Sequence, residues 1–285
     1  MDRRTLLKRF AVAAVAPAAY SGYAAAAGLR GSSEWLYQAL RGGIPGVTRV
    51  VISGSNSDID TATVPEDIWG GGGLMPRATS AETWEIVSTS ANDTAGGTGA
   101  QSVSLETLGT GGVIQPISVV PNGLTAVTLT GTHLAANAGA VTANGSLGHN
   151  DGDLTIRVAG GGATRAVISA TNAVLNQSRY TVPTGYRLDM LSMLVAMRST
   201  LGSESALMYF MTRTAAGREL ATVPFPLFAS GVPLYRHEVS GGLAPFVSLG
   251  AGTEANARVF SVTQNNMTLD VASLALRIDT TIFPT

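Results

Sequence analysis

Residues 269–279 of the chain read Leu269-Asp270-Val271-Ala272-Ser273-Leu274-Ala275-Leu276-Arg277-Ile278-Asp279. The second half of this stretch alternates between two faces: Leu274, Leu276 and Ile278 lie on one, and Ala275, Arg277 and Asp279 lie on the other. A period of two residues is typical of a β-strand that packs one face on a core. The stretch therefore predicts a half-buried strand, and the sequence upstream can be searched for strands that would pair with it.

Short β-patterned segments separated by turn residues fill most of the chain. Seven further strands are expected in its last part, at 179–182, 187–197, 205–212, 219–228, 232–239, 246–249 and 257–263. Seven more precede them, at 48–52, 84–88, 101–108, 113–119, 124–129, 140–143 and 153–158. No helical pattern interrupts either group, and turns such as Asn144-Gly145 favour hairpins. We predict a mainly β protein with two antiparallel β-sandwich domains, at 46–165 and 166–285, of which the second is jelly-roll-like.

The first 45 residues differ, and predict a short helical N-terminal arm. Ala and Leu dominate there, and Ser33 is a suitable N-cap for a helix that ends before Gly42 and Gly43. An apolar stripe with no adequate partner inside the arm predicts docking on another chain. Its candidate docking residues are Leu6, Leu7, Phe10, Trp35, Leu36 and Leu40.

The start of the arm also has a second interpretation. Asp2-Arg3-Arg4-Thr5-Leu6-Leu7-Lys8, followed by an apolar stretch, resembles a twin-arginine export signal. A retained segment that docks on a partner explains the same residues. We favour the docking segment and keep export as the alternative.

Composition excludes several classes of function. Charged residues make up 13% of the 285, about half the usual share of roughly 25%. The net charge of −1 gives no electrostatic footprint for nucleic acid, and no apolar run is long enough for a membrane-spanning helix. The chain has no cysteine, which excludes disulfides, thiolate metal sites and cysteine nucleophiles. Low surface charge in a soluble protein is typical of a surface that partners cover.

One acidic pattern resembles the start of a calcium loop. Asn56, Asp58 and Asp60 recur at two-residue spacing, but the twelfth position of such a loop would be Asp67 rather than the required Glu. Short polar side chains at this spacing also form Asx turns with their own backbone. We favour the Asx turn, and expect no metal site and no cofactor.

Catalytic patterns are weak throughout the sequence. His133, His149 and His237 occur in three unrelated contexts, and no Gly-x-Ser-x-Gly nucleophile elbow is present. The carboxylates Glu66, Asp67, Glu82 and Glu85 do not form a recognisable acid–base pair. The run Gly70–Gly73 lacks the Lys and Ser or Thr of a phosphate loop. We expect no catalytic residue and no enzyme activity.

Several motifs resemble a pattern found in structural proteins of tailed bacteriophages of the short-tailed, podovirus type. They are Glu66-Asp67-Ile68-Trp69-Gly70, the strand Glu82-Thr83-Trp84-Glu85-Ile86-Val87-Ser88, the loop Ser90-Ala91-Asn92-Asp93-Thr94 with Gly97-Thr98-Gly99, and Tyr180-Thr181-Val182-Pro183-Thr184-Gly185. The resemblance covers about residues 50–285, and the Asn-Asp-Thr loop is its most specific part. It implies a virion component rather than an enzyme, with a C-terminal β domain, and trimers are usual in that family.

These observations lead to one expected function and two alternatives. The expected function is a tail-fibre or fibre-anchor subunit at the head–tail junction, docked on a head–tail adaptor, the portal or the major capsid protein. Such a protein is assembled into the virion in the host cytoplasm. The alternatives are a capsid decoration (cement) protein, and a carbohydrate-binding or carbohydrate-active protein exported by the twin-arginine route.

The second domain is expected to drive self-association, in a homotrimer. Methionines are frequent in the expected strands between 188 and 211, and flexible apolar side chains can adapt to a neighbouring subunit. Pro224 and Pro226 keep the apolar segment 223–228 out of a central strand, which favours an edge or a contact. The candidate self-association residues are Met190, Met193, Met197, Phe225 and Phe228.

Overall fold

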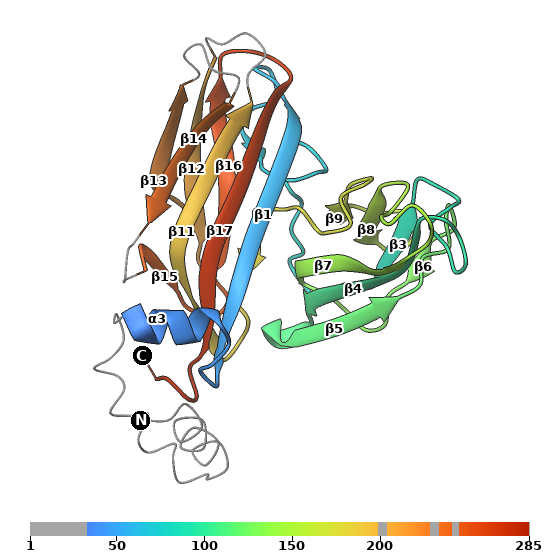
Figure 1. The fold of residues 1–285 in the computed structure, drawn as a ribbon, viewed down its shortest axis with the longest axis horizontal. Coiled ribbons are helices and arrows are strands. Elements are labelled where there is room, and N and C mark those ends of the chain that lie inside the picture. Colours follow the sequence, from blue (N-terminus) through green and yellow to red (C-terminus); the bar gives the residue numbers. More distant parts are fainter. Residues whose placement is uncertain (1–32, 199–203, 229–233, 241–244, 285) are drawn as a thin grey trace, which may run out of the picture.

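The computed structural model describes residues 33–198, 204–228, 234–240 and 245–284. They form two antiparallel β-sandwiches of different size and one short helix, α3 (Ser33–Leu40) (Figure 1). The prediction of a mainly β protein with antiparallel sheets behind a short N-terminal helix is therefore confirmed. The docking candidates Leu6, Leu7 and Phe10 and the twin-arginine-like segment lie outside the described residues.

The larger sandwich consists of two five-stranded sheets. In the first sheet the strand order is β1 (Val47–Ile59), β17 (Met267–Asp279), β11 (Tyr186–Arg198) and β14 (Leu234–Ser240), and β15 (Val247–Leu249) also pairs with β11. In the second sheet the order is β10 (Tyr180–Thr181), β16 (Glu254–Val262), β12 (Ser205–Arg213) and β13 (Glu219–Phe228), and β2 (Glu66–Asp67) also pairs with β16. The alternating stretch 269–279 thus lies in a central strand, β17.

The smaller sandwich consists of a four-stranded and a three-stranded sheet. The first has the order β6 (Val127–Thr128), β3 (Trp84–Ser88), β8 (Leu154–Val158) and β9 (Thr164–Ile168). The second has the order β5 (Ile114–Val119), β4 (Ala100–Leu108) and β7 (Ala135–Asn144), with a 3₁₀ turn, η3 (Thr110–Gly112), between β4 and β5. Trp84 and Leu105 are buried between the two sheets.

The smaller sandwich is an insertion into the larger one. The chain leaves the larger sandwich after β2 and returns at β10, and the two connecting segments run antiparallel to each other. Trp69 forms a β-bridge with Gln177, and the backbone N–H of Ser178 donates to the carbonyl of Ile68 at 2.9 Å. Figure 1 shows β1 beside the C-terminal strand β17, although the smaller sandwich, from β3 to β9, lies between them in sequence.

Strand pairing therefore distributes the chain differently from the expected ranges 46–165 and 166–285. β1 and β2 lie in the sheets of the larger sandwich, and a boundary at 165/166 falls within β9. The reason is that β1 pairs with β17 through eleven of its residues, between Val47 and Ile59. The sequence pattern does not predict this pairing, because it places each strand only beside its neighbours in the chain.

The core of the larger sandwich contains most of the residues proposed for self-association. Met190, Met193, Met197 and Phe225 are all at most 1% exposed and belong to one hydrophobic cluster. One chain thus uses these four side chains internally, so they are not available for a subunit contact. Phe228, by contrast, is 60% exposed at the end of the edge strand β13.

The helix α3 packs on the outer face of the sheet that contains β1, β17 and β11. Ala39 is fully buried there, and Trp35, Leu36 and Leu40 are partly buried against the same cluster. The cluster is completed by Ile44, Val47, Leu191, Leu276, Ile278 and Phe283. The apolar stripe of this helix therefore has a partner inside its own chain. Docking of the same residues on another chain stays a prediction.

Candidate functional site

Two acidic residues of β2, Glu66 and Asp67, fix the start of the insertion on the larger sandwich. Asp67 is fully buried, and its Oδ1 accepts hydrogen bonds from Asn256 Nδ2 and Arg258 Nε, each at 2.6 Å. Its Oδ2 accepts from the backbone N–H of Met75 at 2.9 Å. Glu66, 2% exposed, accepts from Asn56 Nδ2 and from the backbone N–H of Gly73, both at 2.9 Å. Both carboxylates hold the chain in place where it leaves β2.

The glycine run after these carboxylates is a loop shaped around Trp69. Gly72 and Gly73 have φ values of +67° and +63°, which glycine adopts without strain. The indole Nε1 of Trp69 donates to their carbonyls at 2.9 and 3.1 Å. A Cβ on Gly71 would lie 2.4 Å from the Trp69 ring, so only glycine fits there. The glycines of this run thus allow the loop to pack closely around the Trp69 ring.

Arginines extend this network along the junction. Arg258 also donates to Glu219 at 2.8 Å. Arg77, in the connecting segment, lies 3.0 Å from Glu219 and 2.7 Å from Glu254. These contacts join β16, β13 and the connecting segment through alternating charges, and each carboxylate touches at least one guanidinium.

Arg179 is the most deeply buried cation at the junction. It is 3% exposed and donates only to backbone carbonyls, those of Pro76 at 3.2 Å, Met75 at 3.3 Å and Arg165 at 3.5 Å. Burial lowers the pKa of Arg179 to about 10, although the negative charge of Glu254 opposes that shift. At neutral pH it still carries its charge.

The Asn-Asp-Thr loop is organised around Asp93, which is fully buried in the smaller sandwich. Its Oδ1 accepts from the backbone N–H groups of Ala100 at 2.7 Å and Asp151 at 2.9 Å. Its Oδ2 accepts from Ser88 Oγ at 2.5 Å and the backbone N–H of Gly152 at 2.9 Å. Four donors from three segments therefore meet on one carboxylate, leaving it no lone pair directed at solvent or substrate.

The acidic residues of the neighbouring strand are also paired. Glu82 receives two hydrogen bonds from the guanidinium of Arg165, at 2.9 and 3.0 Å. Glu85 accepts from Arg157 at 2.7 Å and from the backbone N–H groups of Gly160 and Gly161 at 3.0 and 3.1 Å. The amide of Gly160, followed by Arg157, lowers the pKa of Glu85. Both glutamates thus have structural partners inside the smaller sandwich.

The expected Asx turn is present at Asn56, whose Oδ1 accepts the backbone N–H of Asp58 at 3.1 Å. The carboxylate of Asp60 turns away from it and accepts the backbone N–H of Asn266 at 2.8 Å. Within the part of the chain that the structure describes, no three His, Asp or Glu side chains are grouped so that they could hold a metal ion.

The three histidines lie far apart in the fold. His133 is fully buried, contacts Thr107 Oγ1 through Nδ1 at 3.0 Å and packs 5.1 Å from the Trp84 ring. Burial lowers the pKa of His133, so it is neutral at physiological pH. His149 Nδ1 lies 2.9 Å from the carbonyl of Asn150, and His237 lies in β14. No contact joins His133 and His149, the two histidines whose side chains the structure describes.

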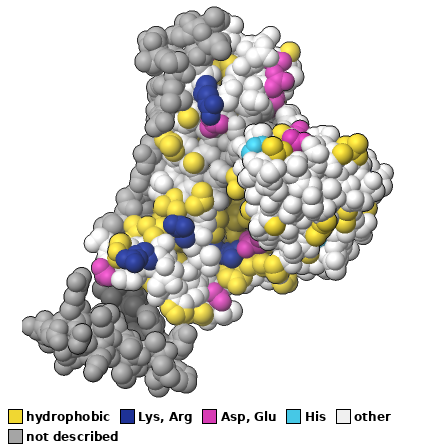
Figure 2. All heavy atoms as spheres, turned by 45° about the vertical axis from the view of Figure 1, so that its right-hand side comes forward, with side chains coloured by type: hydrophobic (Ala, Val, Ile, Leu, Met, Phe, Trp, Pro, Cys, Tyr) yellow, Lys and Arg dark blue, Asp and Glu magenta, His cyan; other side chains and the backbone are white. Residues whose placement is uncertain are grey.

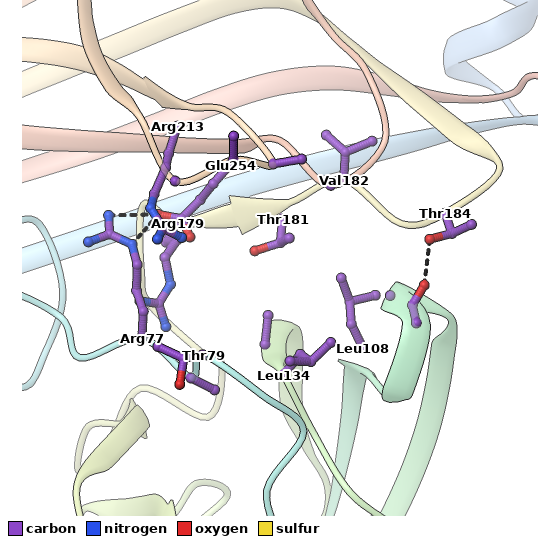
Figure 3. Close-up of a pocket in the computed structure, with 18 residues that line it drawn as sticks. Arg77, Thr79, Leu108, Leu134, Arg179, Thr181, Val182, Thr184, Arg213 and Glu254 are labelled. Carbon is purple, nitrogen blue, oxygen red and sulfur yellow. Dashed lines mark hydrogen bonds and ion pairs between the residues drawn. The ribbon is translucent and has the colours of Figure 1, made fainter.

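A cleft of about 410 Å³ opens between the two sandwiches next to the arginine network (Figure 3). Arg77, Arg179, Arg213 and Glu254 lie at one end of it, and Leu108, Leu134 and Val182 lie at the other. Sequence analysis did not identify this cleft, because its lining residues come from segments spread between positions 77 and 254.

The surface is poor in charge, as the composition indicates. In the view of Figure 2, uncharged polar and hydrophobic side chains predominate, and several of the few charged groups lie next to a group of opposite charge. Val51 on the edge strand β1 is 62% exposed. No helix among the described residues is both long enough and apolar enough to span a membrane.

Comparisons with known proteins give little further information. No protein-family model matches the chain, and no curated protein matches it. Two matching solved structures are viral. The VP2 subviral particle of infectious bursal disease virus is 10% identical, with a TM-score of 0.19, over 82% of this chain and 70% of that chain. The Gx strain of the same virus is 11% identical, with a TM-score of 0.21, over 82% and 72%. At such TM-scores the likeness carries no argument.

Proposed function

We propose that the protein is a non-enzymatic structural subunit of a bacteriophage particle. The observation that carries the proposal is the role of Asp93, the central residue of the most specific motif in the resemblance to phage structural proteins. Its carboxylate is saturated by four donors inside the fold. Glu66, Asp67 and Glu82, from the other motifs, are likewise used in internal contacts. Motifs whose buried carboxylates are used in contacts within the fold support a structural role.

Within the particle we propose a tail-fibre or fibre-anchor subunit at the head–tail junction. The arm formed by residues 1–45 would dock on an adaptor, the portal or the major capsid protein, and the subunit would form a homotrimer. The low surface charge supports extensive contact with partners. Capsid decoration remains the second candidate, since a cement protein would use the same kind of surface.

Quantitative mass spectrometry of purified particles tests both levels of the proposal. An appendage subunit is expected in tens of copies per particle, and a decoration protein in hundreds, because the latter follows the coat lattice. Sedimentation of the full chain tests the trimer. Absence of the protein from purified particles, with recovery in the periplasm of the producing cell, would instead support export.

A further inference from the structure

We propose that the cleft between the two sandwiches binds a carboxylate attached to a short apolar body, with Arg213 as the residue that binds the charged group. The cleft has a volume of about 410 Å³, within the range of small-ligand sites. Its two ends differ in chemistry: one is charged and the other is apolar (Figure 3). A ligand that matches both ends must be amphipathic.

Arg213 carries a positive charge that no carboxylate of the network neutralises through a direct side-chain contact. Arg77, Arg179, Arg213 and Arg258 face Asp67, Glu219 and Glu254 across the junction, so the cluster has a net charge of +1. Arg77 and Arg258 are paired with these carboxylates. The backbone of Arg213 pairs with Glu219 and Glu254 in the sheet, and its charge acts on Glu219, but its side chain forms no hydrogen bond or ion pair with any residue that the structure describes, and it is only partly buried.

The single surplus charge selects the kind of anion. A monovalent carboxylate would neutralise the cluster, whereas a divalent phosphate would leave it with a net negative charge near Glu254. The guanidinium of arginine presents a planar pair of donors that matches the two oxygens of a carboxylate. Arg179 lies behind it as a second positive charge that the structure pairs only with carbonyl oxygens.

The opposite end of the cleft supplies the apolar contact. Leu134, which is half-buried, is the accessible apolar side chain there, and Leu108 and Val182, each only 1% exposed, also line this end. Gly111, Gly112 and Gly252 also line the cleft, and they leave its wall without side chains. We expect a hydrocarbon segment of a few carbons to pack against Leu134 and this wall, because burying its methylenes removes apolar surface from water.

Two sources of this chemistry exist, a free organic acid and an acidic side chain of another protein next to an apolar residue. Isothermal titration of the full chain with hexanoate, and with the blocked peptide acetyl-Leu-Glu-Leu-amide, distinguishes them. Saturable binding of hexanoate alone assigns the site to a small acid, and tighter binding of the peptide assigns it to a protein partner. Hexan-1-ol, which has the apolar chain without the charge, is expected to bind at least tenfold more weakly than hexanoate.

The variant Arg213→Gln removes the proposed ligand of the carboxylate and is expected to weaken binding of the preferred probe at least tenfold. Arg198→Gln is the matched control. It removes the same charge from β11, where Arg198 pairs with Asp270 at 2.9 Å, outside the cleft, and binding should stay within twofold. Leu134→Asn should weaken hexanoate more than acetate. Failure of both probes to saturate at about 10 mM, or equal binding by Arg213→Gln and the native chain, would overturn the proposal.

Discussion

Asp93 gathers donors from strands that lie far apart in the sequence. Ser88 and Ala100 flank its own loop, whereas the amides of Asp151 and Gly152 arrive from a turn about 58 residues downstream. Hydrogen bonds to a charged acceptor are individually stronger than those to a neutral one. A buried carboxylate is stable in this position only because all four donors are directed at it.

Replacing this carboxylate by an amide should destabilise the smaller sandwich. Asp93→Asn keeps the shape but puts an NH₂ group against two of the four donors, and we expect a loss of about 3 kcal/mol in the free energy of unfolding. Urea denaturation followed by tryptophan fluorescence measures it, and Trp84 reports on the smaller sandwich. Asp151→Asn, in the facing turn, is the control, because Asp151 accepts only from the side chains of Ser90 and Asn92. Equal loss in both variants would contradict the special role of Asp93.

A side-chain contact can be predicted from the sequence when its two partners lie close together in the chain. The Asx turn at Asn56 was predicted because its acceptor and donor are two residues apart. The burial of Asp93 and the pairing of Asp67 with Arg258 were not predicted. Their partners are brought together by the completed fold, and spacing along the chain carries no trace of them.

At the scale of elements, the helix α3 shows how a short segment is stabilised by its neighbours. Eight residues are too few for a stable isolated helix in water. Contact of Trp35, Leu36 and Ala39 with the outer face of the first sheet supplies what the helix lacks. The apolar stripe of α3 is visible in the sequence, but the sequence does not show which sheet the stripe packs on.

A charge on the buried side of α3 should detach it. Ala39→Asp places a carboxylate at a fully buried position, and we expect a loss of about 2 kcal/mol together with faster hydrogen exchange across residues 33–40. Ser33→Asp introduces the same side chain at the exposed first residue of the helix, where it can cap the helix as Ser33 does, and should change exchange little. If Ala39→Asp exchanges like the native chain, this helix does not depend on the sheet.

Strand positions were more predictable than strand partners. The expected strands 84–88 and 219–228 coincide with β3 and β13, because period-two patterns and turn residues are local signals. The short β10, by contrast, occupies only Tyr180–Thr181 of the expected 179–182. The pairing of β1 with β17 depends on contacts more than 200 residues apart, which no local pattern reports.

At the scale of the whole molecule, the insertion determines which parts can fold alone. The smaller sandwich keeps its complete core, from Trp84 to Leu175, between two adjoining connecting segments. The larger sandwich needs strands from both sides of the insertion, and its β1 covers one edge of β17. Chain termini or insertion points that lie close together are the usual condition for independent folding of an inserted domain.

Three fragments test this division. Residues 79–176 should unfold cooperatively as a separate domain, since both sheets and the whole cluster around Trp84 are retained. Residues 166–285 should not, because the fragment cuts β9, lacks β1 and leaves Arg258 without the buried carboxylate of Asp67. Joining residues 33–78 to 178–285 through a flexible linker of about ten residues should restore folding, since such a linker spans a distance of roughly 15–20 Å.

Circular dichroism during thermal unfolding distinguishes the three fragments. A cooperative transition in 166–285 equal to that of the joined chain would show that β1 is dispensable and that the two sandwiches divide at the boundary expected from sequence.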